Sequence, residues 1–100
     1  MIVRGVATTP QAESDLDEIW LSIAADSVDR ADAFVDKLTA RFVTLARSPR
    51  AGRSGQALAP GLRSFSFRSY VIFYSLGKEG IIIERVLHGA RDIDRIFRND

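Results

Sequence analysis

Residues 70–87 read YVIFYSLGKEGIIIERVL, and this stretch decides the fold. Tyr70–Leu76 is rich in β-branched and aromatic residues, which favour a central strand of a sheet. Gly77-Lys-Glu-Gly80 provides a turn, and Ile81–Leu87 returns as a second apolar strand. The stretch therefore predicts an antiparallel β-hairpin.

A third strand precedes this hairpin. From Leu62 the hydrophobic period is two, with Arg63 on the same side as the phenylalanines at 65 and 67. A turn near Arg68-Ser69 joins this strand to the hairpin. Residues 49–61 hold three glycines and two of the three prolines, which predicts a loop.

Two amphipathic helices come before the strands. The first is expected from Pro10 to about Ala25, with Thr9 as its cap. The second begins after Asp26-Ser27, with Ser27 or Asp29 as its cap, and ends at Ser48-Pro49. Each carries one apolar stripe at three- and four-residue steps: Ala12, Leu16, Ile19, Trp20 and Ile23 on the first, and Ala31, Phe34, Val35, Leu38, Phe42, Leu45 and Ala46 on the second. The short connection makes the helices antiparallel neighbours.

The two ends complete the predicted order. Met1–Thr8 alternates like a strand, and His88–Asp100 has apolar residues at the spacing of a short helix. The expected fold class is α+β: an N-terminal strand, an antiparallel helical hairpin packed on a mainly antiparallel sheet, and a short C-terminal helix. Because 100 residues is an ordinary size for one domain, residues 1–100 are expected to form a single one.

The composition excludes several classes of site. The chain has no cysteine, so it has no disulfide, no thiolate nucleophile and no cysteine metal site. His88 is the only histidine, and we expect neither a metal nor a cofactor. The N-terminal stretch lacks the apolar core of a signal peptide, and no segment approaches the ~18 apolar residues of a membrane span. A cytoplasmic protein is the expectation.

Charge is distributed unevenly along the chain. Residues 1–46 carry four basic and eight acidic side chains, whereas residues 47–100 carry ten basic and five acidic ones. Nine of those ten basic residues are arginines, whose planar guanidinium suits carboxylate and phosphate. An anionic partner is one interpretation, and an ordinary solvated surface is the other.

The candidate site lies at the end of the last strand, in the segment from Glu84 to Asp92. His88 is either a structural histidine bonded to Asp92 or a backbone group, or a general acid or base. Arg85 is expected on the side opposite Val86, which is the open face of the sheet if the helices cover Val86. Arg63 is a second candidate for that face, where the arginines would bind phosphate or an acidic protein tail. Exposed arginines that only keep the face soluble are the alternative.

The same segment ends in two charged residues with simpler roles. Arg91 and Asp92 are expected to pair with each other or to cap the C-terminal helix, and capping is the favoured role for Asp92. Elsewhere the acids of the first helix are expected only to cap the helix and to solvate it.

Several segments taken together resemble the ParE branch of the ParE/RelE toxin superfamily. They follow one another along nearly the whole chain: Asp15-Leu-Asp-Glu-Ile-Trp20, Leu45-Ala-Arg-Ser-Pro49 with Gly52-Arg53, Gly61-Leu-Arg-Ser64, Tyr70-Val-Ile-Phe-Tyr74 and Arg85-Val-Leu-His-Gly-Ala-Arg-Asp92. The resemblance implies the toxin of a type II toxin–antitoxin pair that poisons DNA gyrase without catalysis of its own.

The resemblance also implies a partner, a ParD-like antitoxin whose segment docks beside the helices, with Trp20, Phe34 and Leu38 as candidate contacts. The target-facing candidates are Arg63, Arg85, His88 and Arg91. The alternative is a RelE-like, ribosome-dependent messenger ribonuclease, in which Arg85 neutralises the phosphate and His88 acts as acid or base. A noncatalytic nucleic-acid-binding module is a third possibility, disfavoured because the nine aromatic residues mostly belong to the core.

Overall fold

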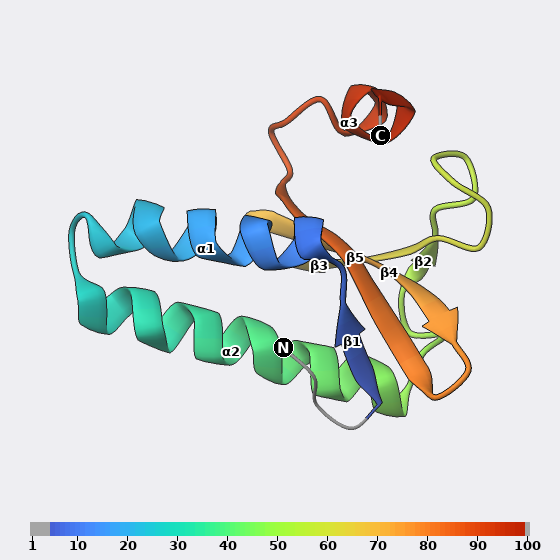
Figure 1. The fold of residues 1–100 in the computed structure, drawn as a ribbon, viewed down its shortest axis with the longest axis horizontal. Helices are drawn as coiled ribbons and strands as arrows, with labels where there is room; N and C mark the ends of the chain where they lie inside the picture. Colours follow the sequence, from blue (N-terminus) through green and yellow to red (C-terminus); the bar gives the residue numbers. More distant parts are fainter. Residues whose placement is uncertain (1–4, 100) are drawn as a thin grey trace.

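The computed structural model describes residues 5–99 and contains a five-stranded sheet and three helices in that range (Figure 1). The elements are β1 (Val6–Thr8), α1 (Pro10–Ala24), α2 (Val28–Arg47), β2 (Arg53–Ser54), β3 (Arg63–Phe67), β4 (Tyr70–Gly77), β5 (Gly80–His88) and α3 (Ile93–Asn99). The predicted order of strand, two helices, three strands and a short helix is confirmed.

The sheet has the strand order β1-β5-β4-β3-β2. β1 runs parallel to β5, and the other three pairings are antiparallel, so the mainly antiparallel sheet is confirmed. β4 occupies the centre, as its composition predicts. The first four residues of the predicted N-terminal strand lie outside the described residues. β2 was not predicted, because two residues inside a glycine-rich loop carry no periodicity.

α1 begins at its predicted cap, Thr9, and α2 begins at Ser27, one of the two caps expected for it. The Thr9 hydroxyl accepts a hydrogen bond from the Ala12 backbone N–H at 3.0 Å, and the Ser27 hydroxyl accepts one from the Arg30 N–H at 3.2 Å. Thr9 also donates to the Glu84 carbonyl at 2.8 Å. Its side chain therefore starts α1 and ties the start of that helix to β5.

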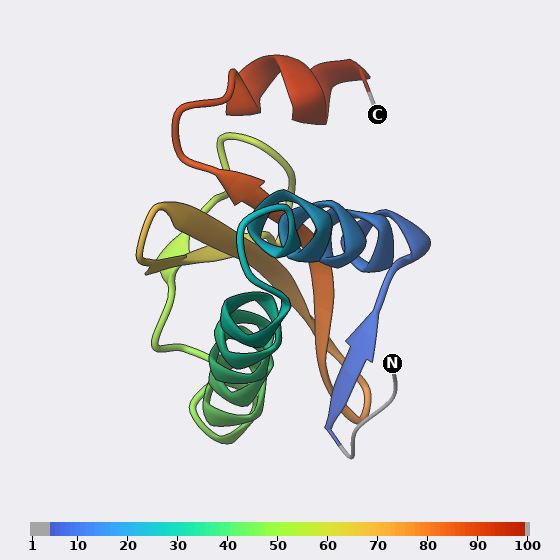
Figure 2. The ribbon, with the colours of Figure 1, turned by 90° about the vertical axis from the view of Figure 1, so that its left-hand side faces the viewer.

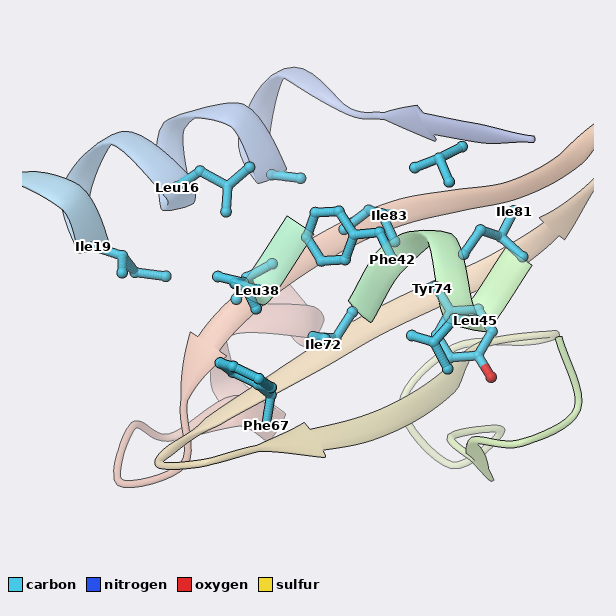
Figure 3. Packing of buried hydrophobic residues seen from close by; sticks show 13 residues of the cluster. Leu16, Ile19, Leu38, Phe42, Leu45, Phe67, Ile72, Tyr74, Ile81 and Ile83 are labelled. Carbon is cyan, nitrogen blue, oxygen red and sulfur yellow. The ribbon is translucent and has the colours of Figure 1, made fainter. Parts of the chain in front are cut away.

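The helical hairpin covers one face of the sheet, and the main core lies between them (Figures 2 and 3). The core takes residues from both helices and from four strands, among them Leu16, Leu38, Phe42, Ile72, Tyr74 and Ile83. Burial of this apolar surface is the main stabilising contribution to the fold.

The opposite face of the sheet is not open, which corrects the expectation from the sequence. Leu62, Phe73 and Leu87 form a second, smaller cluster there, and the loop residues Leu58 and Ala59 pack on it. α3 adds its apolar residues to this cluster, with the ring of Phe97 4.9 Å from that of Phe73. α3 lies away from α1 and α2 in both views (Figures 1 and 2).

The pairing of β4 with β5 contains a β-bulge. Phe73 pairs with Arg85 while Tyr74 pairs with Ile83, so Glu84 is an extra residue of β5. Because of this residue, Ile83 and Val86 both belong to the core beneath the helices. Arg85 and Leu87 then share the other side of the strand, and the predicted opposition of Arg85 and Val86 is confirmed.

The turn between β3 and β4 is strained at Arg68. Phe67 and Tyr70 close the hairpin, and Arg68 has φ +53°, the only positive φ at a non-glycine residue in the described range. This conformation costs an ordinary side chain about 1 kcal/mol relative to glycine. The turn was predicted at this place; its backbone strain was not.

The loop after α2 is held by a buried tyrosine. Tyr74 is fully buried (0% exposed), donates its hydroxyl to the Pro49 carbonyl at 2.7 Å and accepts from the Gly52 N–H at 2.9 Å. Gly52 is required at this contact, since a Cβ there would lie 2.5 Å from the same hydroxyl.

Tyr74→Phe is expected to lower the free energy of unfolding by about 2 kcal/mol, because it leaves the buried Gly52 N–H without its acceptor. Urea denaturation measures the change. Tyr70→Phe is the matched control, since the Tyr70 hydroxyl makes no hydrogen bond to a described residue, and it should change stability little. Equal midpoints for the two variants would contradict the role of the Tyr74 hydroxyl.

Candidate functional site

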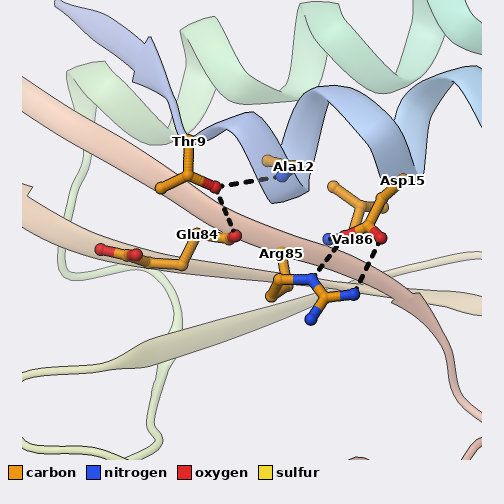
Figure 4. A network of polar contacts seen from close by, with 6 residues as sticks. All are labelled: Thr9, Ala12, Asp15, Glu84, Arg85 and Val86. Carbon is orange, nitrogen blue, oxygen red and sulfur yellow. Dashed lines mark hydrogen bonds and ion pairs between the residues drawn. The ribbon is translucent and has the colours of Figure 1, made fainter. Parts of the chain in front are cut away.

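Arg85 is joined to the first helix by a two-point ion pair (Figure 4). Its Nε donates to Oδ2 of Asp15 at 2.9 Å, and its Nη2 donates to Oδ1 at 3.0 Å. The side chains are only 15% and 6% exposed, respectively. Asp15 also accepts the backbone N–H of Val86 at 2.9 Å. Arg85 is thus neutralised within the fold, which corrects its expected role as an arginine on an open face.

The position of Asp15 follows from the short first strand. β1 pairs with β5 only as far as Thr8 opposite Ile83, and α1 then begins. The N–H of Val86 lies beyond that pairing, and the Asp15 carboxylate supplies the acceptor that a longer strand would have provided. The expectation that the acids of this helix only cap and solvate is therefore wrong for Asp15. Its place on the apolar stripe, three residues after Ala12, was the signal that could have revealed it.

Arg63 supports a loop and does not join Arg85. Its Nη2 donates to the carbonyls of Gly52 at 2.8 Å and Arg50 at 3.2 Å. Arg63 shares one side of β3 with Phe65 and Phe67, which pack beneath the helices. Its expected place on the opposite face is therefore wrong, because that side of β3 faces the main core.

His88 lies at the exposed end of β5. Its Nδ1 accepts the backbone N–H of Ala90 at 3.0 Å, and its ring meets that of Tyr70 edge to face at 5.2 Å. This is the structural histidine bonded to a backbone group that the sequence offered as one interpretation. Asp92 caps α3 as predicted, with Oδ1 accepting the Arg95 N–H at 3.3 Å.

His88 and Arg91 are brought together by a small pocket between α1 and the end of β5. Its volume is about 150 Å³, and it is lined by Asp15, Glu18, Ile19, Ser22, Tyr70, Val86, His88 and Arg91. A second, larger pocket of about 400 Å³ lies beside Arg85, Glu84 and Phe97. Within residues 5–99 there is no cluster of three or more metal-ligating side chains. The chemistry available at the smaller pocket is that of two exposed basic side chains, His88 and Arg91, and two acids, Glu18 and the ion-paired Asp15.

Comparison with known proteins identifies the family of this chain. A family model described as "ParE toxin of type II toxin-antitoxin system, parDE" matches residues 6–93, which is most of the chain. The chain belongs to the ParE toxin family. The predicted resemblance to this branch of the superfamily is confirmed.

Two ParE toxins are similar along nearly their whole length. The toxin ParE1 of Mycobacterium tuberculosis (strain ATCC 25618 / H37Rv) is 36% identical over 89 residues, covering 87% of this chain and 91% of its own. The toxin ParE3 of Caulobacter vibrioides is 32% identical over 91 residues, covering 90% of each chain. A solved structure, "Chromosomal ParDE TA system from P. aeruginosa", superposes with a TM-score of 0.71 at 21% identity, covering 85% of this chain and 95% of its own. That likeness confirms the ParE-like fold.

The three candidate antitoxin contacts of this ParE-family chain differ in exposure. Trp20 is half-buried and donates its indole N–H to Asp32 of α2 at 2.8 Å. Phe34 is half-buried, and its ring lies edge to face with those of Phe67 and Tyr70. Leu38 is 0% exposed in the main core. Leu38 therefore has no surface for a partner in this structure, because both helices and the sheet enclose it.

Proposed function

We propose that this ParE-family chain is a cytoplasmic toxin that arrests bacterial growth by poisoning DNA gyrase, and that a cognate ParD-like antitoxin neutralises it. Membership of the family supports the toxin role. The similar ParE toxins, matched over nearly their full length, support it further. Within residues 5–99, no helix is long and apolar enough to cross a membrane.

The observation that carries the choice of inhibitor over ribonuclease is the ion pair of Arg85 with Asp15. A phosphate-neutralising arginine has to direct its N–H donors at the substrate. Arg85 instead directs Nε and Nη2 at a carboxylate of its own chain, in a site where little solvent reaches either group. An arginine held in this way supports the fold, which favours inhibition by binding.

The exposed candidates divide the surface between the two proposed partners. His88 and Arg91 lie together at the pocket beside α1 and are the residues we assign to target contact. Trp20 and Phe34 lie half-buried on the helices and are assigned to an amphipathic antitoxin segment. Arg63 and Arg85 are not assigned to either partner. Arg63 stabilises the loop after α2, and Arg85 stabilises the contact between β5 and α1.

Expression in bacteria and assays with the purified chain together test the proposed function. Expression of this chain alone should halt growth, and coexpression of the antitoxin should restore it. The purified chain should inhibit gyrase supercoiling and trap cleaved DNA, and it should leave messenger RNA intact on translating ribosomes. Normal growth at high soluble expression contradicts the toxin role, and site-specific message cleavage contradicts the gyrase target.

His88→Ala distinguishes the two mechanisms at one residue. If the chain inhibits by binding, its potency should fall less than about tenfold, since one exposed ring is lost. A general acid or base contributes about 10²–10⁴-fold, so a ribonuclease would lose nearly all of its activity. Gyrase inhibition titrated with wild type and variant measures the effect, and circular dichroism checks that the variant has folded.

A further inference from the structure

Two arginines converge on one phenylalanine at the turn between β3 and β4. The guanidinium carbons of Arg41, on α2, and of Arg68, in the turn, each lie 5.6 Å from the centre of the Phe67 ring. Arg41 lies equally close to the ring of Phe65. The guanidinium carbons of Arg41 and Arg68 are therefore separated by no more than twice 5.6 Å. Both side chains are exposed, whereas Phe67 is only 7% exposed.

Within residues 5–99, no carboxylate forms an ion pair with Arg41 or Arg68. The described contacts that favour these two cations are those with the rings of Phe67 and, for Arg41, Phe65, together with solvent. The backbone adds a second observation, because Arg68 holds the positive φ that glycine would adopt freely. Local stability alone thus favours glycine in this turn, and the arginine points to a contact made by its side chain.

The strand beside these arginines has an incomplete outer edge. β2 pairs only with Arg63 and Ser64, and among the described residues no strand continues along β3 past Ser64. An extended segment from another protein can pair with such an edge. Alternate side chains of such a segment would lie on the side of Phe65 and Phe67, where Arg41 and Arg68 are placed.

We propose that this arginine pair, Arg41 and Arg68 over Phe67, binds the carboxylates of an extended acidic segment of a protein partner lying along the edge of β3. The aromatic rings support a peptide over a single-stranded nucleic acid. Phe67 and Phe34 lie edge to face, 5.6 Å apart, and Phe67 is buried, so this ring offers no open face for a base. The inference rests on the proposed function only in that the partner is a protein.

A labelled peptide of alternating glutamate and leucine is a suitable probe, with its glutamine counterpart as the uncharged control. Fluorescence anisotropy should show binding of the acidic peptide that weakens with added salt, and little binding of the glutamine peptide. Arg41→Ala and Arg68→Gly should each weaken binding about tenfold, the value of a charge-assisted hydrogen bond. Arg30→Ala, an exposed arginine on the same helix as Arg41, should bind like wild type.

Arg68→Gly removes the guanidinium while relieving the backbone strain, so the variant is expected to keep the fold in thermal melts. Arg41→Ala, at an exposed helix position, provides the same test without altering the turn. Equal binding by wild type, both variants and Arg30→Ala would overturn the inference. Failure of wild type to bind the acidic peptide, or tighter binding of an oligothymidylate, would overturn it as well. Growth arrest by wild type is scored separately, so a toxic chain without peptide binding rejects this inference alone.

Discussion

Asp15→Ala is expected to lower the free energy of unfolding by about 3 kcal/mol, which is a large share of the stability of a domain of this size. The substitution removes three acceptor contacts at once: those to Nε and Nη2 of Arg85 and that to the N–H of Val86. Arg85, which has little access to water, loses the carboxylate that accepts two of its N–H donors. Urea denaturation followed by circular dichroism measures the loss.

Two further variants make the interpretation specific. Asp17→Ala lies exposed on the same helix and should change stability by less than about 0.5 kcal/mol. The double variant Asp15→Ala with Arg85→Met should be less destabilised than the sum of the single variants, because no buried charge remains uncompensated. Identical midpoints for Asp15→Ala and Asp17→Ala would show that the ion pair contributes nothing.

The same double variant also separates structure from function. If Arg85 acts only through Asp15, the refolded double variant should inhibit gyrase at nearly wild-type potency. A double variant that folds and yet loses all activity would place Arg85 in direct contact with the target, against its assignment as a supporting residue.

Gly80→Ala is expected to lower the free energy of unfolding by about 4 kcal/mol, at least as much as Asp15→Ala. Gly80 has φ +145°, and a Cβ at this position would lie 2.1 Å from the carbonyl oxygen of Gly5. That oxygen accepts the N–H of Ile81 at 2.8 Å, in the contact that aligns β1 with β5. The methyl group therefore has to push the two strands apart, and hydrogen exchange at the Ile81 amide should accelerate together with the loss of stability.

Gly61 provides the control for backbone conformation alone. It has φ +76°, and a Cβ there would meet nothing within 4 Å. Gly61→Ala should therefore cost about 1 kcal/mol, the price of a positive φ for an ordinary residue. If Gly80→Ala and Gly61→Ala prove equally stable, the close approach of β1 to the turn is not a constraint on the sequence.

Periodicity and caps predicted the elements because they are local properties. The alternation in Tyr70–Leu76, the stripes of the two helices and the caps Thr9 and Ser27 all depend on residues a few positions apart. The branch of the toxin superfamily also followed from the sequence, since its motifs recur in order. These parts of the prediction did not require knowledge of how distant segments meet.

The site could not be predicted in the same way, because it depends on strand edges. The alternation of residues along β5 gives the correct side for Arg85. It does not reveal that Asp15 of α1 contacts β5 just beyond the point where its pairing with β1 ends. Similarly, local alternation puts Arg63 on the side of Phe65 and Phe67, but which side of β3 the helices cover is set by long-range pairing with β4 and packing on α2. The convergence of Arg41 and Arg68 on Phe67 joins a helix to a distant turn and has no local signature.

The bulge at Glu84 makes the number of residues in β5 as important as their chemistry. Regular pairing of every residue in β5 would turn Arg85 into the helix-covered core and Val86 toward the α3 layer, whereas the bulge keeps both on their present sides. A one-residue insertion elsewhere in β5, without a bulge to absorb it, would reverse the sides of the residues that follow and rebuild the interior on both faces. Insertions in the loop before β3 carry no such penalty, and we expect length variation among relatives to accumulate there.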